Sequence, residues 1–298
     1  MKTFKQLALI GPTASGKTAL SIKIAQQMNA YILSLDSLSI YKEIDIVSAK
    51  PSMKERAGIR HFGIDTLYAN ETFDVTTFIR LYHEVHSQCL QEGKNLVVVG
   101  GTSFYLKMLI EGISVLPSIS IETKQEAKRH LQDLKKTYEW LQSLDNVYMS
   151  SIDANDPYRI EKALHIYLET HLTPTQYFKK FPPEPTITTP LPVYQIDIDR
   201  ATLRERIGLR TNMMINNGLI DEICMLEKMY TRIPNCMKAI GIKETLGYLD
   251  GVYDKKILNE KIITNTARLA KRQTTFNNSQ FDNVIKGSVE ELEKLLLS

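Results

Sequence analysis

The residues from Gly11 to Thr18 constrain the fold of this chain more than any other stretch. A glycine, four residues and then Gly-Lys-Thr form the phosphate-binding P-loop pattern. The flanking sequence predicts a short buried strand over 6–10 and a helix over 18–28. Backbone N–H groups and the helix dipole at such a junction hold anions. We therefore expect a phosphate site made by Gly11, Pro12, Thr13, Ala14, Ser15, Gly16, Lys17 and Thr18.

Within this loop, two side chains have separate expected roles. The Lys17 ammonium would reach terminal phosphate oxygens, and the Thr18 hydroxyl would hold Mg²⁺. The loop alone does not say which phosphate compound it binds.

The composition is that of an ordinary folded protein, with 43% hydrophobic and 24% charged residues. A net charge of +3 neither demands nor excludes a nucleic-acid partner. Cys89, Cys224 and Cys236 form no CxxC pair, which argues against a zinc site or a disulfide framework and suits a reducing cytoplasm. The first strand begins too early for a signal peptide, and no apolar run approaches the roughly 18 residues of a membrane span. We expect a cytoplasmic monomer.

Strand and helix patterns alternate in the first part of the chain. Further strands are expected at 31–35, 59–64, 96–99 and 193–197, with helices at 73–92 and 104–111 between them. This alternation is typical of an α/β fold with a doubly wound parallel sheet. Together with the P-loop it predicts a P-loop NTPase-like core.

A helical segment interrupts this core. From 122 to about 173 the chain predicts helices only, including one over 122–144 and another over 157–169. A proline cluster from Pro174 to Pro192 then predicts an irregular connector. We expect an inserted all-helical domain at 117–190. The core would comprise 1–116 and 191–298, and its last part would be helical at 203–217, 220–230, 240–249, 255–280 and 289–297.

Asp36 follows the second expected strand, at the carboxyl edge of the sheet where doubly wound folds bind ligands. Near a P-loop, its carboxylate could serve as a general base toward a nucleophile. The alternative is an Asp that only caps the next segment.

The strand at 96–99 ends in Gly100-Gly101-Thr102, where P-loop ATPases commonly have an acidic residue that positions magnesium. The missing acid disfavours an ATP-driven motor or switch. The glycines allow a ligand to approach the backbone, and the Thr102 hydroxyl could contact a phosphate oxygen. A simple tight turn before a helix is the alternative.

Several basic residues share helix faces. Arg159 and Lys162 are three apart, and Arg206 and Arg210 are four apart. An arginine that faces the loop would stabilise charge on a leaving phosphate. A larger group in the 255–280 helix could follow a nucleic-acid backbone, or could be a solvated face. It consists of Lys261, Arg268, Lys271 and Arg272.

An ordered set of motifs resembles the tRNA dimethylallyltransferase family, whose members move a five-carbon group from dimethylallyl diphosphate to the exocyclic amine of the adenine 3′ to the anticodon. The P-loop, Asp36-Ser37 and Gly100-Gly101-Thr102 match this family. The other matching pieces are Tyr41, Asp45, Ala49-Lys50-Pro51, Tyr105, Asp156-Pro157-Tyr158-Arg159-Ile160, Ala239-Ile240-Gly241, Lys243-Glu244, Thr266-Ala267-Arg268 and Ala270-Lys271-Arg272-Gln273.

The resemblance implies a role for each part. Asp36 would take the proton of the adenine amine, and Thr102 would contact the diphosphate bridge or the leaving oxygen. Lys17, Thr18 and Arg210 would hold the diphosphate with Mg²⁺, and the insertion would grip the anticodon stem. The implied tRNA contacts are Asp36, Ser37, Leu38, Ser39, Thr102, Lys124, Arg159, Lys162, Lys261, Arg268, Lys271 and Arg272.

Some positions depart from the family. Ser39 stands where glutamine is usual, and Lys124 stands where arginine is expected, which keeps the charge but loses the bidentate fork. Three alternatives remain open: a small-molecule or nucleoside kinase, a transferase that prenylates free AMP, and a non-enzymatic nucleic-acid-binding switch. A kinase needs only a compact lid, whereas this chain devotes about 75 residues to the insertion.

Overall fold

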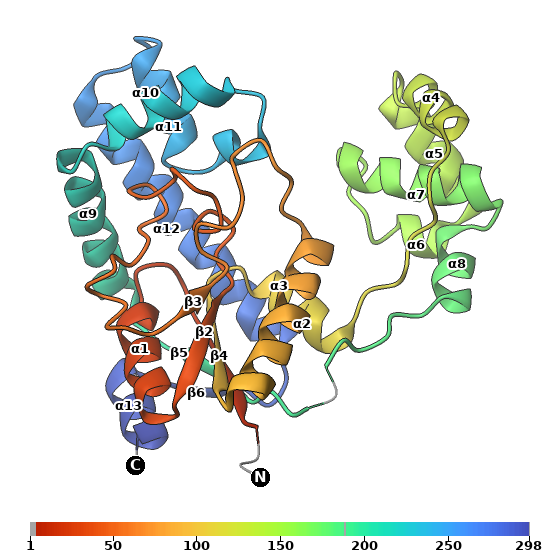
Figure 1. Cartoon of the computed structure of the whole chain (residues 1–298). Helices are drawn as coiled ribbons and strands as arrows, with labels where there is room; N and C mark the ends of the chain where they lie inside the picture. The colour runs from red at the N-terminus through yellow and green to blue at the C-terminus, as the bar shows by residue number, and fades with distance from the viewer. Residues whose placement is uncertain (1–3, 188, 298) are drawn as a thin grey trace. The chain divides into compact units, whose positions relative to one another are not determined.

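The computed structural model describes residues 4–187 and 189–297 and divides into two compact units (Figure 1). The larger unit spans Met1–Ile110 and Ile187–Ser298, and the smaller one spans Glu111–Thr186. The smaller unit thus starts before the expected residue 117 and ends before residue 190. Its ends are joined by an isolated bridge between Ile113 and Glu184, and Gly112 lies against the Glu184 backbone.

The larger unit is built on a six-stranded sheet of order β3-β2-β4-β1-β5-β6, in which every pair is parallel. The expected doubly wound α/β fold is confirmed. The 59–64 strand shrinks to two residues, and β6 is an edge strand that the sequence did not reveal because its three residues form no apolar run. The strands are β1 (Gln6–Ile10), β2 (Ala30–Ser34), β3 (His61–Phe62), β4 (Asn95–Gly100), β5 (Val193–Ile196) and β6 (Ile285–Gly287).

Helices cover both faces of the sheet. Leu7 and Leu9 of β1 pack in one cluster with α1 (Lys17–Gln27) and α13 (Val289–Leu297). Ala8 and Ile10 point to the other side and pack with α2 (Val75–Glu92) and α3 (Ser103–Glu111). Successive side chains of a strand alternate between faces, so this short apolar strand serves two cores. The P-loop leaves β1 between these two layers.

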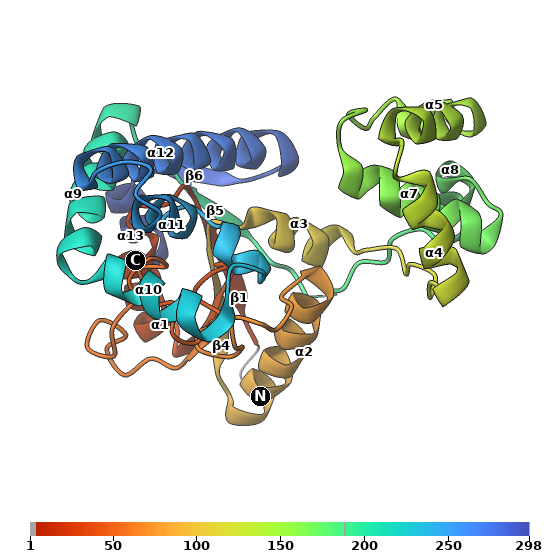
Figure 2. The same cartoon turned by 90° about the horizontal axis from the view of Figure 1, so that it is seen from above.

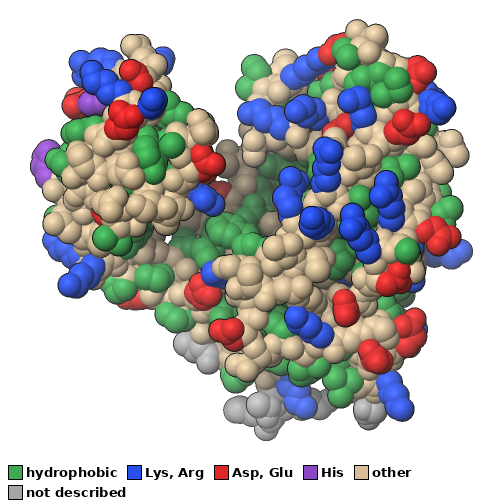
Figure 3. All heavy atoms as spheres, turned by 180° about the vertical axis from the view of Figure 1, so that it is seen from behind, with side chains coloured by type: hydrophobic (Ala, Val, Ile, Leu, Met, Phe, Trp, Pro, Cys, Tyr) green, Lys and Arg blue, Asp and Glu red, His purple; other side chains and the backbone are tan. Residues whose placement is uncertain are grey.

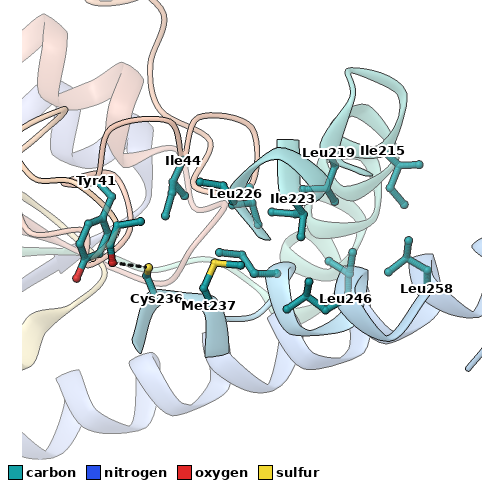
Figure 4. Close-up of a cluster of buried hydrophobic side chains, with 14 of the residues drawn as sticks. Tyr41, Ile44, Ile215, Leu219, Ile223, Leu226, Cys236, Met237, Leu246 and Leu258 are labelled. Atoms are coloured by element: carbon teal, nitrogen blue, oxygen red, sulfur yellow. Dashed lines mark hydrogen bonds between the residues drawn. The ribbon is translucent and has the colours of Figure 1, made fainter. Parts of the chain in front are cut away.

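A helical layer lies beyond the carboxyl end of the sheet. It contains α9 (Arg200–Asn216), α10 (Leu219–Tyr230), α11 (Ile242–Leu249) and α12 (Lys255–Gln280), with α9 and α12 side by side (Figure 2). A 3-10 turn at Asn235–Lys238 joins this layer. Figure 4 shows its buried cluster, in which Tyr41 and Ile44 from the segment after β2 pack with Leu226 and Cys236. Cys236 Sγ donates a hydrogen bond to Ala69 O at 3.3 Å. The layer therefore anchors the chain that follows Asp36.

The smaller unit is entirely helical apart from its linkers. The expected 122–144 helix is wrong as a single element, because it breaks between α4 (Ile121–His130) and α5 (Leu134–Leu144). Asp133 caps α5 by accepting from Lys136 N, and Thr137 Oγ1 donates to His130 O at the end of α4. The break is therefore satisfied locally on both sides.

Three more helices complete this unit: α6 (Asn146–Met149), α7 (Pro157–Thr170) and α8 (Pro174–Lys180). Pro174 was expected in an irregular connector, but it opens α8. Proline at the first helical position loses no hydrogen bond, and Thr173 and Gln176 form a capping box there. No helix within 4–187 and 189–297 is long and apolar enough to cross a membrane.

Candidate functional site

A pocket of about 460 Å³ lies where the ends of β1 and β2 meet the helical layer. Thr13 and Ala14 of the P-loop, Asp36 and Arg210 line its polar part. Lys238, Asn235 and Thr211 are among its other polar lining residues. Its apolar lining includes Tyr41, Val47, Phe73, Met214, Ile240, Ile262 and Leu269. A pocket that combines apolar side chains with convergent polar groups is typical of a small-molecule site.

The P-loop has the backbone geometry that its glycines predict. Gly16 has φ +97° at the start of α1, a conformation that other residues rarely adopt. A side chain at Gly11 would come within 3.2 Å of Ser15 Oγ and 3.3 Å of Ile196 Cβ. Two amides of the loop already have protein partners, since Ser15 N donates to Pro12 O and Thr13 N donates to Gln273 Oε1. The loop can therefore offer an anion fewer N–H groups than the sequence suggested.

Lys17 turns back onto its own loop. Its Nζ donates to Gly11 O at 2.9 Å and to Pro12 O at 2.6 Å. Burial and, to a smaller extent, the positive charge of Arg210 lower the pKa of Lys17 to about 7, and the negative charge of Asp36 partly opposes this shift. A bound phosphate would place a negative charge beside the buried Lys17 ammonium and so stabilise its charged form.

Arg206 and Arg210, four apart on α9, both reach the P-loop. Arg206 Nη1 donates to Ser15 O at 3.4 Å, and Arg210 Nη1 donates to Thr13 Oγ1 at 3.3 Å. Burial lowers the pKa of Arg210, and the Asp36 carboxylate opposes the shift. The shared face inferred from their spacing thus lies against the loop. One pocket groups six of the predicted site residues: Thr13, Ala14, Asp36, Ser37, Leu38 and Arg210.

The Asp36 carboxylate caps the segment that follows it and also lines the pocket. Its Oδ1 accepts from Leu38 N at 2.8 Å and from Ser39 N at 3.1 Å. The capping role and the expected role as a base are thus compatible. Oδ1 accepts both backbone hydrogen bonds, and Oδ2 is a second oxygen of the same carboxylate. Ser37 and Leu38 line the pocket too. Ser39 is buried with its Oγ 3.2 Å from Ser34 Oγ, which argues against direct contact of this hydroxyl with RNA.

The Gly100-Gly101-Thr102 turn lies beside the P-loop, since Ile10 is the register partner of Gly100. A side chain at Gly100 would collide with Leu35, at 2.6 Å from its Cβ. Gln273 of α12 joins the turn to the P-loop, because its Nε2 donates to Gly101 O at 3.0 Å while its Oε1 accepts from Thr13 N. Gln273 ends the Ala270-Lys271-Arg272-Gln273 motif, and the sequence alone indicated no role for it. Thr102 follows directly and is partly buried before α3.

The basic residues of α12 lie on its exposed side. Lys261, Arg268, Lys271 and Arg272 are all exposed, and Lys and Arg side chains gather on the face of the larger unit shown in Figure 3. The other predicted RNA contacts belong to the smaller unit. There, Lys124 is exposed, Arg159 Nε lies 3.5 Å from Asp156 Oδ2, and Lys162 Nζ lies 5.4 Å from the Tyr158 ring centroid.

Comparison with known proteins assigns the chain to a family. The model described as IPP transferase matches residues 39–280. The chain belongs to the IPP transferase family. The matched range begins after Asp36, but full-length relatives extend the similarity over the P-loop.

Two curated relatives of this IPP transferase are named tRNA dimethylallyltransferase. The protein from Sulfurovum sp. strain NBC37-1 is 69% identical over 98% of this chain and 97% of its own length. The protein from Sulfurimonas denitrificans is 55% identical over 98% of each chain. The solved full-length tRNA isopentenylpyrophosphate transferase from Bacillus halodurans has a TM-score of 0.72 and 26% identity, over 99% of this chain and 96% of that one.

Proposed function

We propose that this chain transfers a dimethylallyl group from dimethylallyl diphosphate to the exocyclic amine of the adenine 3′ to the anticodon of tRNA, and that it releases diphosphate. The observation that carries this proposal is one pocket in which Thr13 and Ala14 of the phosphate loop, the Arg210 guanidinium and the Asp36 carboxylate meet apolar side chains. Two relatives that match almost the whole chain are named for transfer of this group to tRNA. The kinase and AMP alternatives have no such support.

The two parts of the pocket suit the two parts of the donor. The P-loop, Lys17 and Arg210 supply positive charge and N–H groups for the diphosphate. Phe73, Met214 and Ile262 provide an apolar wall for the five-carbon group. Burial of this group stabilises binding by roughly 25 cal/mol per Å² of apolar surface removed from water.

The reaction breaks the bond between C1 of the dimethylallyl group and the bridging oxygen, and the electron pair leaves with the diphosphate. The lone pair of the adenine amine forms the new C1–N bond, and its proton passes to Asp36. The charges of Lys17 and Arg210 stabilise the leaving group where its negative charge develops. Thr102 is the last residue of the turn that Gln273 holds, and it is assigned to contact the bridging oxygen that leaves with the diphosphate.

The residues present fit Mg²⁺ as a phosphate-bound ion. No group of three or more His, Cys, Asp or Glu side chains is arranged for a metal within 4–187 and 189–297. Mg²⁺ typically keeps several waters and takes substrate phosphates plus one or two protein oxygens. The exposed Thr18 at the start of α1 would supply such an oxygen. The ion would neutralise charge on the diphosphate.

The acceptor side involves both units. The α12 residues Lys261, Arg268, Lys271 and Arg272 are proposed to contact tRNA phosphates, and the smaller unit, through Lys124, Arg159 and Lys162, to grip the anticodon stem. The target adenine must leave its stack before the amine can reach the pocket. We assign the protein to the cytoplasm as a monomer.

One experiment tests the proposal against its alternatives. The protein is incubated with Mg²⁺ and labelled dimethylallyl diphosphate, and either tRNA or AMP is added. A parallel arm contains labelled ATP and candidate nucleoside acceptors. We expect label in tRNA at the adenine beside the anticodon. Label in AMP alone, or phosphoryl transfer from ATP, would overturn the proposal.

A further inference from the structure

Gln273 holds together the two loops of the diphosphate site. It lies on α12, 260 residues from Thr13 and 172 from Gly101, and it bonds to the backbone of both. The distances are 2.9 Å from Thr13 N to Oε1 and 3.0 Å from Nε2 to Gly101 O. One side chain thus fixes the separation between the P-loop and the turn that carries Thr102.

The chemistry of this bridge suits an amide. Thr13 N–H is a donor and Gly101 C=O is an acceptor, so the bridging group must accept at one end and donate at the other. Glutamine and asparagine do both without charge. A carboxylate can only accept, and an ammonium or guanidinium can only donate. A neutral bridge also leaves the electrostatics of the adjacent diphosphate site to Lys17 and Arg210.

The bridge is also sterically tight. An added Cβ at Gly101 would lie 2.5 Å from Gln273 Nε2 and 3.3 Å from its Cδ. Both atoms belong to the end of the side chain, so a residue larger than glycine at 101 would push the amide away from its bonds. The glycine at 101 therefore serves the bridge.

Gln273 belongs to the face of α12 that is turned to the pocket. Ile262 and Leu269, seven residues apart, line the pocket, and Gln273 lies four residues beyond Leu269. Lys261, Arg268 and Arg272 each precede one of these three, about 100° around the helix, and are exposed. Adjacent faces of one rigid helix thus carry the proposed tRNA contacts and the bridge to the donor loops.

We propose that Gln273 is a positioning residue that sets the distance from the P-loop to Thr102 and thereby the geometry of the leaving diphosphate. The inference rests on the proposed transfer from dimethylallyl diphosphate to tRNA. Misplacement of reacting groups by about 1 Å can cost on the order of 100-fold in rate. Loss of the bridge therefore affects the chemical step and donor binding, and not the exposed basic face of α12.

The test compares Gln273→Met, which keeps length and helix propensity but removes both hydrogen bonds, with Thr275→Ala, an exposed site on the same helix. The single-turnover rate of transfer is measured at saturating tRNA and normalised to the concentration of active enzyme. Donor KM and tRNA Kd are measured as well. For Gln273→Met we expect transfer about 10- to 100-fold slower, a raised donor KM and a tRNA Kd within twofold of wild type. Thr275→Ala should match wild type in all three.

A double-mutant cycle with Gly101→Ala makes the test independent of a general folding defect. If both substitutions act by breaking one bridge, the double variant loses about as much rate as the worse single variant. Losses that multiply, or a Gln273→Met enzyme with wild-type rate and donor KM, would overturn the inference. Failure of the wild-type enzyme to label tRNA would instead overturn the proposed function, so the two failures are distinguishable.

Discussion

Asp36 and Arg210 line the same pocket and interact electrostatically, although they follow β2 and lie on α9, respectively. Lys17 is the third member of this set, because both residues perturb its pKa. The Asp36 carboxylate and the cationic groups of Lys17 and Arg210 thus interact electrostatically at this end of the sheet. The arrangement suits the proposed prenyl transfer to an amine, which requires a proton acceptor separate from the groups that hold the diphosphate.

Asp36→Asn should slow the chemical step while the fold and tRNA binding are retained. Asparagine caps as well as aspartate, so the bonds from Leu38 N and Ser39 N can persist. Loss of the base should lower the single-turnover rate by about 10²- to 10⁴-fold. Rapid-quench measurement on preformed tRNA complexes gives this rate. A normal rate would show that Asp36 is not the base.

Arg210 should act mainly on the donor. Arg210→Ala removes the guanidinium beside Thr13, and a charged hydrogen bond contributes about 1.5–3 kcal/mol, so kcat/KM for the donor should fall roughly 10- to 100-fold. Arg210→Lys should recover only part of this loss, because lysine keeps the charge without the planar fork. Arg204→Ala, an exposed arginine of the same helix, is the matched control. Equal effects at 204 and 210 would contradict the assignment.

Donor binding should take up a proton above neutral pH. The pKa of Lys17 in the free site is lowered from 10.5 to about 7, so at pH 8 the amine is mostly neutral, and the bound diphosphate favours its charged form. Affinity should therefore fall as pH rises above about 7. Calorimetry at pH 8 in two buffers of different ionisation enthalpy measures the uptake, and Lys17→Met should abolish it. Buffer-independent heats for the wild type would refute the prediction.

The same shift has a consequence for the ligand-free fold. The folded-state pKa of Lys17 lies below its unfolded value, so the unfolded chain binds more protons between about pH 7 and 10.5. This group therefore reduces stability below pH 7, and that penalty disappears as pH rises through this window. The direction is opposite to that of a lysine held in a salt bridge.

The exposed face of α12 should dominate the salt dependence of tRNA binding. Arg268→Ala combined with Arg272→Ala removes two proposed phosphate contacts, which should reduce the slope of log K against log salt by roughly 1.4 to 1.8. Lys54→Ala with Lys228→Ala removes the same charge from exposed sites elsewhere. Filter binding at four salt concentrations gives both slopes. Identical slopes for the two double variants would show that α12 carries only a solvated face.

Glu222 should stabilise the segment that leads into the pocket. Its carboxylate accepts from Asp45 N at 3.0 Å, Ile46 N at 2.6 Å and Val47 N at 3.0 Å, and Val47 lines the pocket. Glu222→Ala should lower the free energy of unfolding by about 2–3 kcal/mol, since three backbone donors lose a charged acceptor. Asp221→Ala, in the same first turn of α10, controls for the helix dipole. Urea unfolding measures the difference, and equal losses in the two variants would contradict this role.

Local patterns predicted much of the fold. The P-loop with its strand and helix, the alternation that makes a parallel sheet, and a separate helical segment all follow from short-range spacing. The predictions were wrong or incomplete in segments where the local sequence signal was weak or was compatible with two structures. The edge strand β6 has no apolar run, α4 and α5 are divided by a short capped break, and Pro174 starts a helix where the proline cluster predicted an irregular connector.

The sequence by itself determined a P-loop at residues 11–18 within an α/β core, because those residues are contiguous and their backbone geometry is local. Only the tertiary structure decided which distant side chains meet that loop. Arg206 and Arg210 reach it from α9. Gln273, 260 residues beyond Thr13, ties the loop to Gly101, and Ser39 turns inward. Such contacts depend on how helices pack over the end of the sheet, and spacing along one element carries no information about a partner on another.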